Sequence, residues 1–144
     1  MPLQNRVDPF GRLVATSHRG KLMGNRGLIH GSHQNIEREF RGKRWIYCVL
    51  EFKGRRRKPM TPGLYTELFF LDEATALAAG HRPCAECQRE RYNQFRTAWG
   101  NPRISAGEMD EILHAERMVI RRNANPDWIT VEQATTLPGG VMLV

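Results

Sequence analysis

Two cysteines, Cys84 and Cys87, are separated by two residues in the stretch AAGHRPCAEC. A two-residue spacer lets both sulfur atoms face one metal ion, and tetrahedral zinc requires about four ligands. The chain has only three cysteines, so four thiolates are impossible and other side chains must contribute. The C-x-x-C pair therefore predicts half of a zinc site.

The remaining ligands are sought among the histidines and the third cysteine. His30 and His33 form an H-x-x-H pair in a glycine-rich loop that can fold onto the ion, and His114 can approach from a separate helix. His81 is too close along the turn to close a tetrahedron. We expect a site built from Cys84, Cys87, His30 and His114, with His33 and Cys48 as substitutes.

The same pair has other interpretations. A C-x-x-C pair at a helix start is typical of thioredoxin-like redox chemistry, but here it follows a short helix and a proline turn, where that fold has a strand. Two inert cysteines are a further alternative, and Cys48 can be explained as a small core residue. An odd cysteine count in a chain that we expect to be cytoplasmic predicts no structural disulfide.

A zinc-dependent enzyme acting on nucleic acid or a nucleotide is the main catalytic alternative. Nucleobase deaminases combine H-x-E with P-C-x-x-C, in which the histidine and cysteines hold zinc and the glutamate moves protons. The chain contains both halves, as residues 83–87 and as His114 with Glu116, but in reversed order. Glu116 is the general acid/base under this alternative, which we do not prefer over a non-enzymatic role.

Basic residues are concentrated in one segment of a chain with a formal net charge of +7. Between positions 38 and 58 there are nine lysines and arginines and two glutamates. Such a concentration favours a polyanionic partner. The tight run KGRRRK is typical of an exposed turn, and its candidate nucleic-acid contacts are Lys53, Arg55, Arg56, Arg57 and Lys58. No apolar run is long enough to predict a membrane span.

Local patterns predict a single domain with three regions. Residues 1–35 lack a sustained hydrophobic period and predict a loop-rich arm. Residues 44–52 and 65–71 are β-branched and aromatic, which predicts two strands joined as a hairpin by the long basic loop. Residues 105–144 predict a helix followed by a terminal hairpin.

Helix boundaries are also visible in the sequence. Asp72 can cap a short alanine-rich helix, and Gly80 stands where a left-handed stop is expected. A second helix is predicted over residues 84–99, with the two cysteines in its first turn. Ser105 and Glu108 form an S-x-x-E capping box ahead of the third.

The run TELFFLDEATALAAGHRPCAECQRE resembles the zinc-binding domain of Ada-type DNA methylphosphotriester repair proteins. The resemblance covers about residues 68–90 and consists of two phenylalanines, a short alanine-rich helix, then A-A-G-x-R-P-C-x-x-C. It implies that Cys84 and Cys87 are one pair of zinc ligands within a strand-and-helix fold. It also implies DNA, ahead of RNA, as the partner.

The chain departs from the Ada-type pattern upstream of this run. Ada-type domains carry a second cysteine pair there, and one member accepts the methyl group, whereas EFKGRRRKPMTPG has no cysteine. Methyl transfer is therefore not expected. The whole chain also resembles a group of uncharacterised bacterial proteins that share GNRG, GRRR, ELFFLDEA and LHAER, and this second resemblance implies no activity.

Together these patterns predict an α+β protein with a small antiparallel sheet and two to three helices around an Ada-like metal site. Residues 44–99 are expected to form the Ada-like core. The preferred function is nucleic-acid binding supported by structural zinc. A metal-free protein-interaction module is the remaining alternative.

Overall fold

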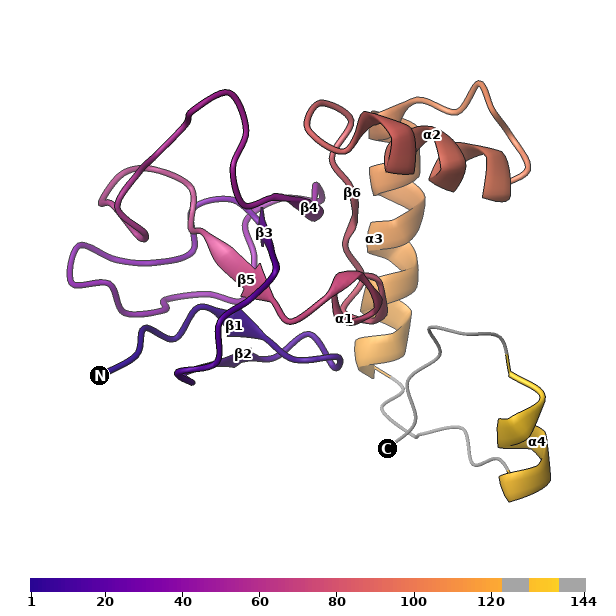
Figure 1. The fold of residues 1–144 in the computed structure, drawn as a ribbon, viewed down its shortest axis with the longest axis horizontal. Coiled ribbons are helices and arrows are strands. Elements are labelled where there is room, and N and C mark those ends of the chain that lie inside the picture. The colour runs from indigo at the N-terminus through magenta and orange to yellow at the C-terminus, as the bar shows by residue number, and fades with distance from the viewer. Residues whose placement is uncertain (123–129, 138–144) are drawn as a thin grey trace.

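The computed structural model describes residues 1–122 and 130–137 of the chain. It has an α+β fold, as predicted, with a six-stranded sheet and, in these described residues, four helices (Figure 1). The predicted sheet was smaller and purely antiparallel. The observed sheet is mixed, because its pairs β1–β5 and β4–β6 are parallel.

The strands are short and are spread over residues 6–83. Their order across the sheet is β2-β1-β5-β3-β4-β6. The bounds are β1 Arg6–Val7, β2 Leu13–Val14, β3 Leu22–Asn25, β4 Ile46–Val49, β5 Leu68–Phe70 and β6 Arg82–Pro83. Three of the six strands lie in residues 1–35, so the predicted loop-rich arm supplies half of the sheet strands.

The predicted hairpin between residues 44–52 and 65–71 is wrong. Both runs form strands, β4 and β5, but β3 lies between them and pairs antiparallel with each. Met23 therefore faces Cys48 on one side and Phe69 on the other. The basic loop consequently connects two strands that are not neighbours.

Gly24 allows β3 to occupy this central position. A Cβ atom at Gly24 would lie 2.1 Å from the carbonyl oxygen of Ile46 and 2.8 Å from Cε2 of Phe70. A Cβ atom essentially never makes non-bonded contacts this short, so only glycine permits the close approach of the strands at this point.

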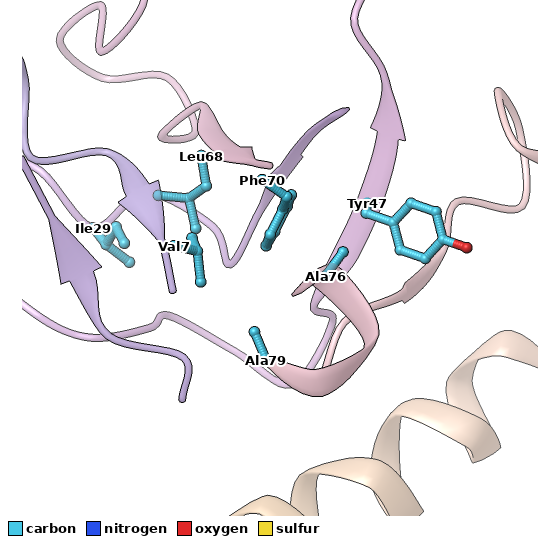
Figure 2. Packing of buried hydrophobic residues seen from close by; sticks show 7 residues of the cluster. All are labelled: Val7, Ile29, Tyr47, Leu68, Phe70, Ala76 and Ala79. Atoms are coloured by element: carbon cyan, nitrogen blue, oxygen red, sulfur yellow. The ribbon is translucent and has the colours of Figure 1, made fainter. Parts of the chain in front are cut away.

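The main hydrophobic core lies between one sheet face and α1, which spans Glu73–Ala78 (Figure 2). Leu68 and Phe70 on β5 and Tyr47 on β4 face this core, together with residues of α1. Because side chains alternate along a strand, Phe69, Ile46 and Cys48 are directed to the opposite face. The opposite face carries the candidate site.

The boundaries of α1 are as predicted. Asp72 is its N-cap, and the Asp72 side chain accepts a hydrogen bond from the Thr75 N–H at 2.8 Å. After the helix, Gly80 adopts a φ of 82°, the left-handed conformation expected at that position.

The next helix begins later than predicted. Residues 82 and 83 form β6, residues 85–88 form a turn, and α2 spans only Arg89–Ala98. The C-x-x-C pair therefore lies in the connection between a strand and a helix, not in the first turn of a helix. Pairing of β6 with β4 overrides the local preference of Pro83 for a helix start.

The longest helix, α3, spans Ala106–Arg122 and begins with the predicted capping box. Ser105 Oγ accepts from the Glu108 N–H at 3.2 Å, and Glu108 Oε2 accepts from the Ser105 N–H at 2.9 Å. A second apolar cluster, formed by residues of α2, α3 and their connection, contains Tyr92, Ile104 and Met109.

The predicted terminal hairpin is wrong where the structure describes it. Residues Val131–Thr135 form α4, which has a capping box between Thr130 and Gln133. The other residues of that predicted hairpin lie outside the described ranges. Within the described ranges, no helix combines the length and apolar character needed to span a membrane.

Candidate metal centre in a basic cleft

Sheet register brings Cys48 and Cys84 together. In the parallel pair of β4 and β6, Ile46 faces Arg82 and Tyr47 faces Pro83. A cysteine follows each residue of the Tyr47–Pro83 pair. The Cys84 N–H, directly after β6, continues the ladder by donating to the Tyr47 carbonyl at 2.9 Å. Two cysteines far apart in sequence therefore occupy adjacent positions across two parallel strands.

The turn after β6 brings the third sulfur to the same point. The Gln88 N–H donates to the Cys84 carbonyl at 3.1 Å, closing a turn that contains Cys87. As a result, the Sγ atoms of Cys48, Cys84 and Cys87 all lie within 4.8 Å of one another. Three thiols are therefore close enough to hold one metal ion.

Hydrogen bonding makes the three sulfurs electrostatically unequal. Cys84 Sγ accepts hydrogen bonds from the Cys48 thiol and from the backbone N–H groups of Cys87 and Glu86, which lowers the pKa of Cys84 to about 5. The shared hydrogen bond with Cys84 and burial raise the pKa of Cys48. Burial raises the pKa of Cys87, whose sulfur accepts from the Val49 N–H. One thiolate is thus preformed, and it is the form that binds metal.

All three cysteines line a cleft of about 1210 Å³ on the sheet face opposite the main core. The floor includes Met23, Ile46 and Phe69 from the three central strands. The walls carry five arginines, Arg44, Arg55, Arg56, Arg57 and Arg82. The cleft therefore places the sulfur cluster beside part of the basic segment.

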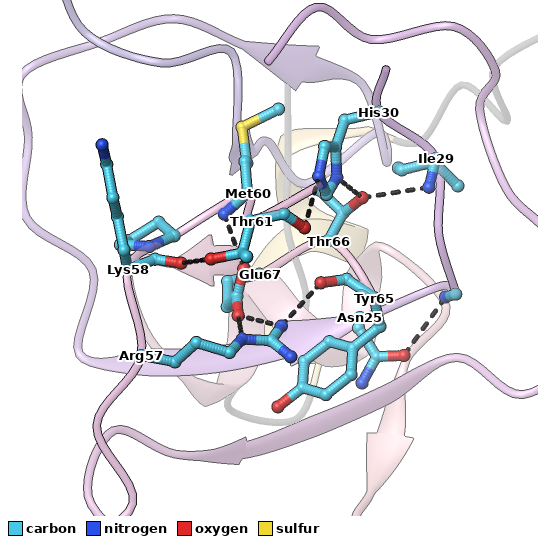
Figure 3. A network of polar contacts seen from close by, with 12 residues as sticks. Asn25, Ile29, His30, Arg57, Lys58, Met60, Thr61, Tyr65, Thr66 and Glu67 are labelled. Carbon is cyan, nitrogen blue, oxygen red and sulfur yellow. Dashed lines mark hydrogen bonds and ion pairs between the residues drawn. The ribbon is translucent and has the colours of Figure 1, made fainter. Parts of the chain in front are cut away.

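His30 does not join the cysteines. It is buried, its Nδ1 contacts Thr66 Oγ1, and its Nε2 lies 3.1 Å from the Thr61 carbonyl (Figure 3). Both ring nitrogens are thus engaged in fixing the loop before β5. The H-x-x-H pattern was not specific enough to distinguish this packing role from metal ligation.

His114 is not brought to the cysteines either. It lies on α3, where its ring packs edge-on against Phe40 at 5.4 Å between ring centroids. Burial, with the positive charges of Arg117 and Lys43, lowers the pKa of His114. Glu116 is exposed on the same helix, His33 is exposed in its loop, and none of these residues lines the cleft. The two halves of the deaminase-like set are therefore not assembled at the cleft.

The basic residues of the loop differ in their surroundings. Arg57 is tied down, because it pairs with the buried carboxylate of Glu67 and donates to the Tyr65 carbonyl at 2.7 Å (Figure 3). Arg55 and Arg56 form exposed ion pairs with Glu86 and Glu51 at 3.3 Å and 3.8 Å. Lys53 and Lys58 are exposed but do not line the cleft.

Two residues of this site, Cys48 and Arg44, are not among the preferred ligands and contacts predicted from the sequence. The sequence predicts Cys48 only as a substitute ligand, although alternation places it on the same strand face as Ile46. Arg44 belongs to the basic segment but is not among the predicted contacts, and it lines the cleft two residues before β4. The parallel pairing of β4 with the two-residue β6, which brings Cys48 beside the C-x-x-C pair, leaves no local signal in the sequence.

The chain was compared with protein-family models, with curated proteins and with solved structures, and none of the three comparisons gave a match.

Proposed function

We propose that this protein binds nucleic acid in the cleft and holds zinc at Cys48, Cys84 and Cys87 in the cleft wall. The observation that carries the proposal is that the three sulfurs and four arginines of the basic segment, Arg44, Arg55, Arg56 and Arg57, line one cleft. The Ada-type resemblance supports zinc as the metal and DNA as the preferred nucleic acid.

The charges in the cleft favour a phosphate backbone. The three carboxylates that line the cleft each form an ion pair with an arginine: Asp110 with Arg82, Glu67 with Arg57 and Glu86 with Arg55. Arg44 and Arg56 are the two further guanidinium groups along the walls. Both are exposed, and Arg56 is paired with the exposed Glu51 at 3.8 Å. Guanidinium groups in such positions bind phosphate oxygens through paired hydrogen bonds.

Aromatic side chains in the cleft favour a single strand. Phe52 and Tyr65 line it, and guanidinium groups already lie over both rings, Arg55 at 5.7 Å and Arg57 at 3.9 Å from the ring centroids. Bases of single-stranded nucleic acid stack on such platforms, with about 1–3 kcal/mol per base lost on removal of the ring.

The metal would have a structural role in this function. It would join β4 to the turn between β6 and α2, so the two walls of the cleft would be held by one ion. Metal binding to such a site contributes directly to folding free energy. Chelation is therefore expected to lower the thermal midpoint of the protein and to weaken nucleic-acid binding together.

The test is the salt dependence of oligonucleotide binding. Fluorescence anisotropy with single-stranded DNA, single-stranded RNA and duplex DNA should show the tightest binding for single-stranded DNA. The double variant R44A/R56A should reduce the slope of log K against log[salt] by about 1–2, because each lost phosphate contact removes roughly one unit or less.

A charge-matched control distinguishes direct phosphate contact in the cleft from the general attraction of nucleic acid to a basic protein. The double variant R12A/R19A removes the same charge from exposed residues that do not line the cleft. Equal losses in the two double variants would contradict binding in the cleft.

A further inference from the structure

The sulfur cluster supplies three metal ligands, whereas tetrahedral zinc takes four. Cys84 and Cys87 are partly exposed, whereas Cys48 is buried, with 9% of its surface exposed. All three line the cleft, so an ion held between them borders the space that a ligand would enter. The fourth ligand would therefore come from a side chain that lines the cleft or from a molecule bound in it.

The carboxylates lining the cleft are already engaged. Asp110 accepts two hydrogen bonds from Arg82, at 2.7 Å and 2.9 Å, and this pair is buried. Glu67 accepts from Arg57 and from the Met60 N–H. Glu86 is paired with Arg55, although that ion pair is exposed. Recruiting any of them would require breaking an ion pair.

Histidine does not fill the position either. No described histidine lines the cleft, and His30 and His114 have the separate contacts given above. His81 is buried against Trp45 and Phe70, at 5.2 Å and 4.7 Å between ring centroids. The residues outside the described ranges include neither cysteine nor histidine in their sequence.

Charge is compatible with a neutral fourth ligand. Three thiolates and a divalent ion have a net charge of about −1, and a neutral ligand leaves that charge unchanged. A neutral ring nitrogen completes the three-sulfur, one-nitrogen donor set that zinc adopts in Cys₃His sites. Nucleobases present ring nitrogens of this kind, and Phe52 and Tyr65 provide nearby surfaces for their rings.

We propose that the three cysteines hold zinc with its fourth position facing the cleft, and that this position takes a nucleobase ring nitrogen of the bound strand. The inference rests on the proposed function for its ligand, but the open position does not depend on it. Base coordination would couple metal and nucleic acid directly, so zinc would contribute to binding beyond its role in holding the walls.

The experiment uses the full chain loaded with Co²⁺, whose visible absorption reports the donors around the ion. Imidazole is expected to shift the cobalt bands saturably, and a mixed-sequence single strand should shift them in the same direction. A strand of the same length with abasic sugars should bind without producing the shift. R44A/R56A should weaken the strand effect and leave the imidazole effect unchanged.

Each contrary result has a separate meaning. Absence of an imidazole shift, or absence of stoichiometric cobalt at the cysteines, overturns the open position. A shift with the abasic strand overturns base coordination in favour of phosphate. A changed spectrum in E86Q before any addition shows that Glu86 occupies the position. Strand binding measured by anisotropy without any shift overturns this inference and leaves nucleic-acid binding intact.

Discussion

Cys48 and Cys84 occupy adjacent positions across the parallel strands β4 and β6, one residue beyond the Tyr47–Pro83 pair. The sequence separates them by 35 intervening residues, and the pairing of β6 brings them together. The sulfur cluster is therefore a product of sheet register at least as much as of the C-x-x-C motif. Any change that displaces β6 should also disperse the sulfurs.

Cys48 should be as important for zinc as the two motif cysteines. C48S, C84S and C87S should each lower zinc affinity by more than about 100-fold, since loss of even outer-shell partners costs roughly 10–100-fold. Elemental analysis and competition with a chromophoric chelator measure this effect. E116Q serves as a control because Glu116 is exposed and does not line the cleft, and it should retain stoichiometric zinc. Full zinc binding by C48S would contradict the three-cysteine site.

Zinc affinity should increase with pH in a defined way. The pKa of Cys84 is lowered from 9.0 to about 5, whereas the pKa values of Cys48 and Cys87 are raised above 9.0. Near neutral pH the metal-free site therefore carries one thiolate and two thiols, and binding through three thiolates releases two protons. Because released protons compete with the ion, log K should rise by about 2 per pH unit between roughly pH 6 and 8. Calorimetry in buffers of different ionisation enthalpy counts the protons, and release of none would contradict the assignment.

Local patterns predicted the caps and the helices better than the sheet and the site. Asp72, Gly80 and the Ser105–Glu108 box act within a few residues of their own positions, so their signals survive in the sequence. The insertion of β3 between β4 and β5 depends on the space beside Gly24, a property of the packed sheet. His30 shows the same limit, since its two hydrogen-bond partners lie more than 30 residues away.

The Arg57–Glu67 pair should stabilise the basic loop, while Arg56 should not. Glu67 is 5% exposed in its side chain, so R57A would leave a buried carboxylate with the Met60 N–H as its main partner. Loss of a partner to a buried charged group costs about 1–3 kcal/mol. R56A removes an exposed ion pair and should change the free energy of unfolding by less than about 1 kcal/mol. Urea unfolding of both variants measures the difference, and equal effects would contradict a stabilising role of the Arg57–Glu67 pair.

The buried Arg82–Asp110 pair should couple the stability of α3 to the geometry of the metal centre. Arg82 is 3% and Asp110 10% exposed in their side chains, and the Arg82 backbone belongs to β6, two residues before Cys84. D110A would leave an unpaired buried guanidinium, for which about 3–5 kcal/mol of stability is lost. Because β6 would shift with its arginine, zinc affinity should decrease as well, although Asp110 is not a ligand. E111A is the matched control on the same helix, since Glu111 forms only an exposed ion pair with Lys43 and should cost at most about 1 kcal/mol. Unfolding monitored with and without saturating zinc separates the two effects: a D110A protein that loses stability but binds zinc normally would show that the sulfur cluster is positioned independently of α3.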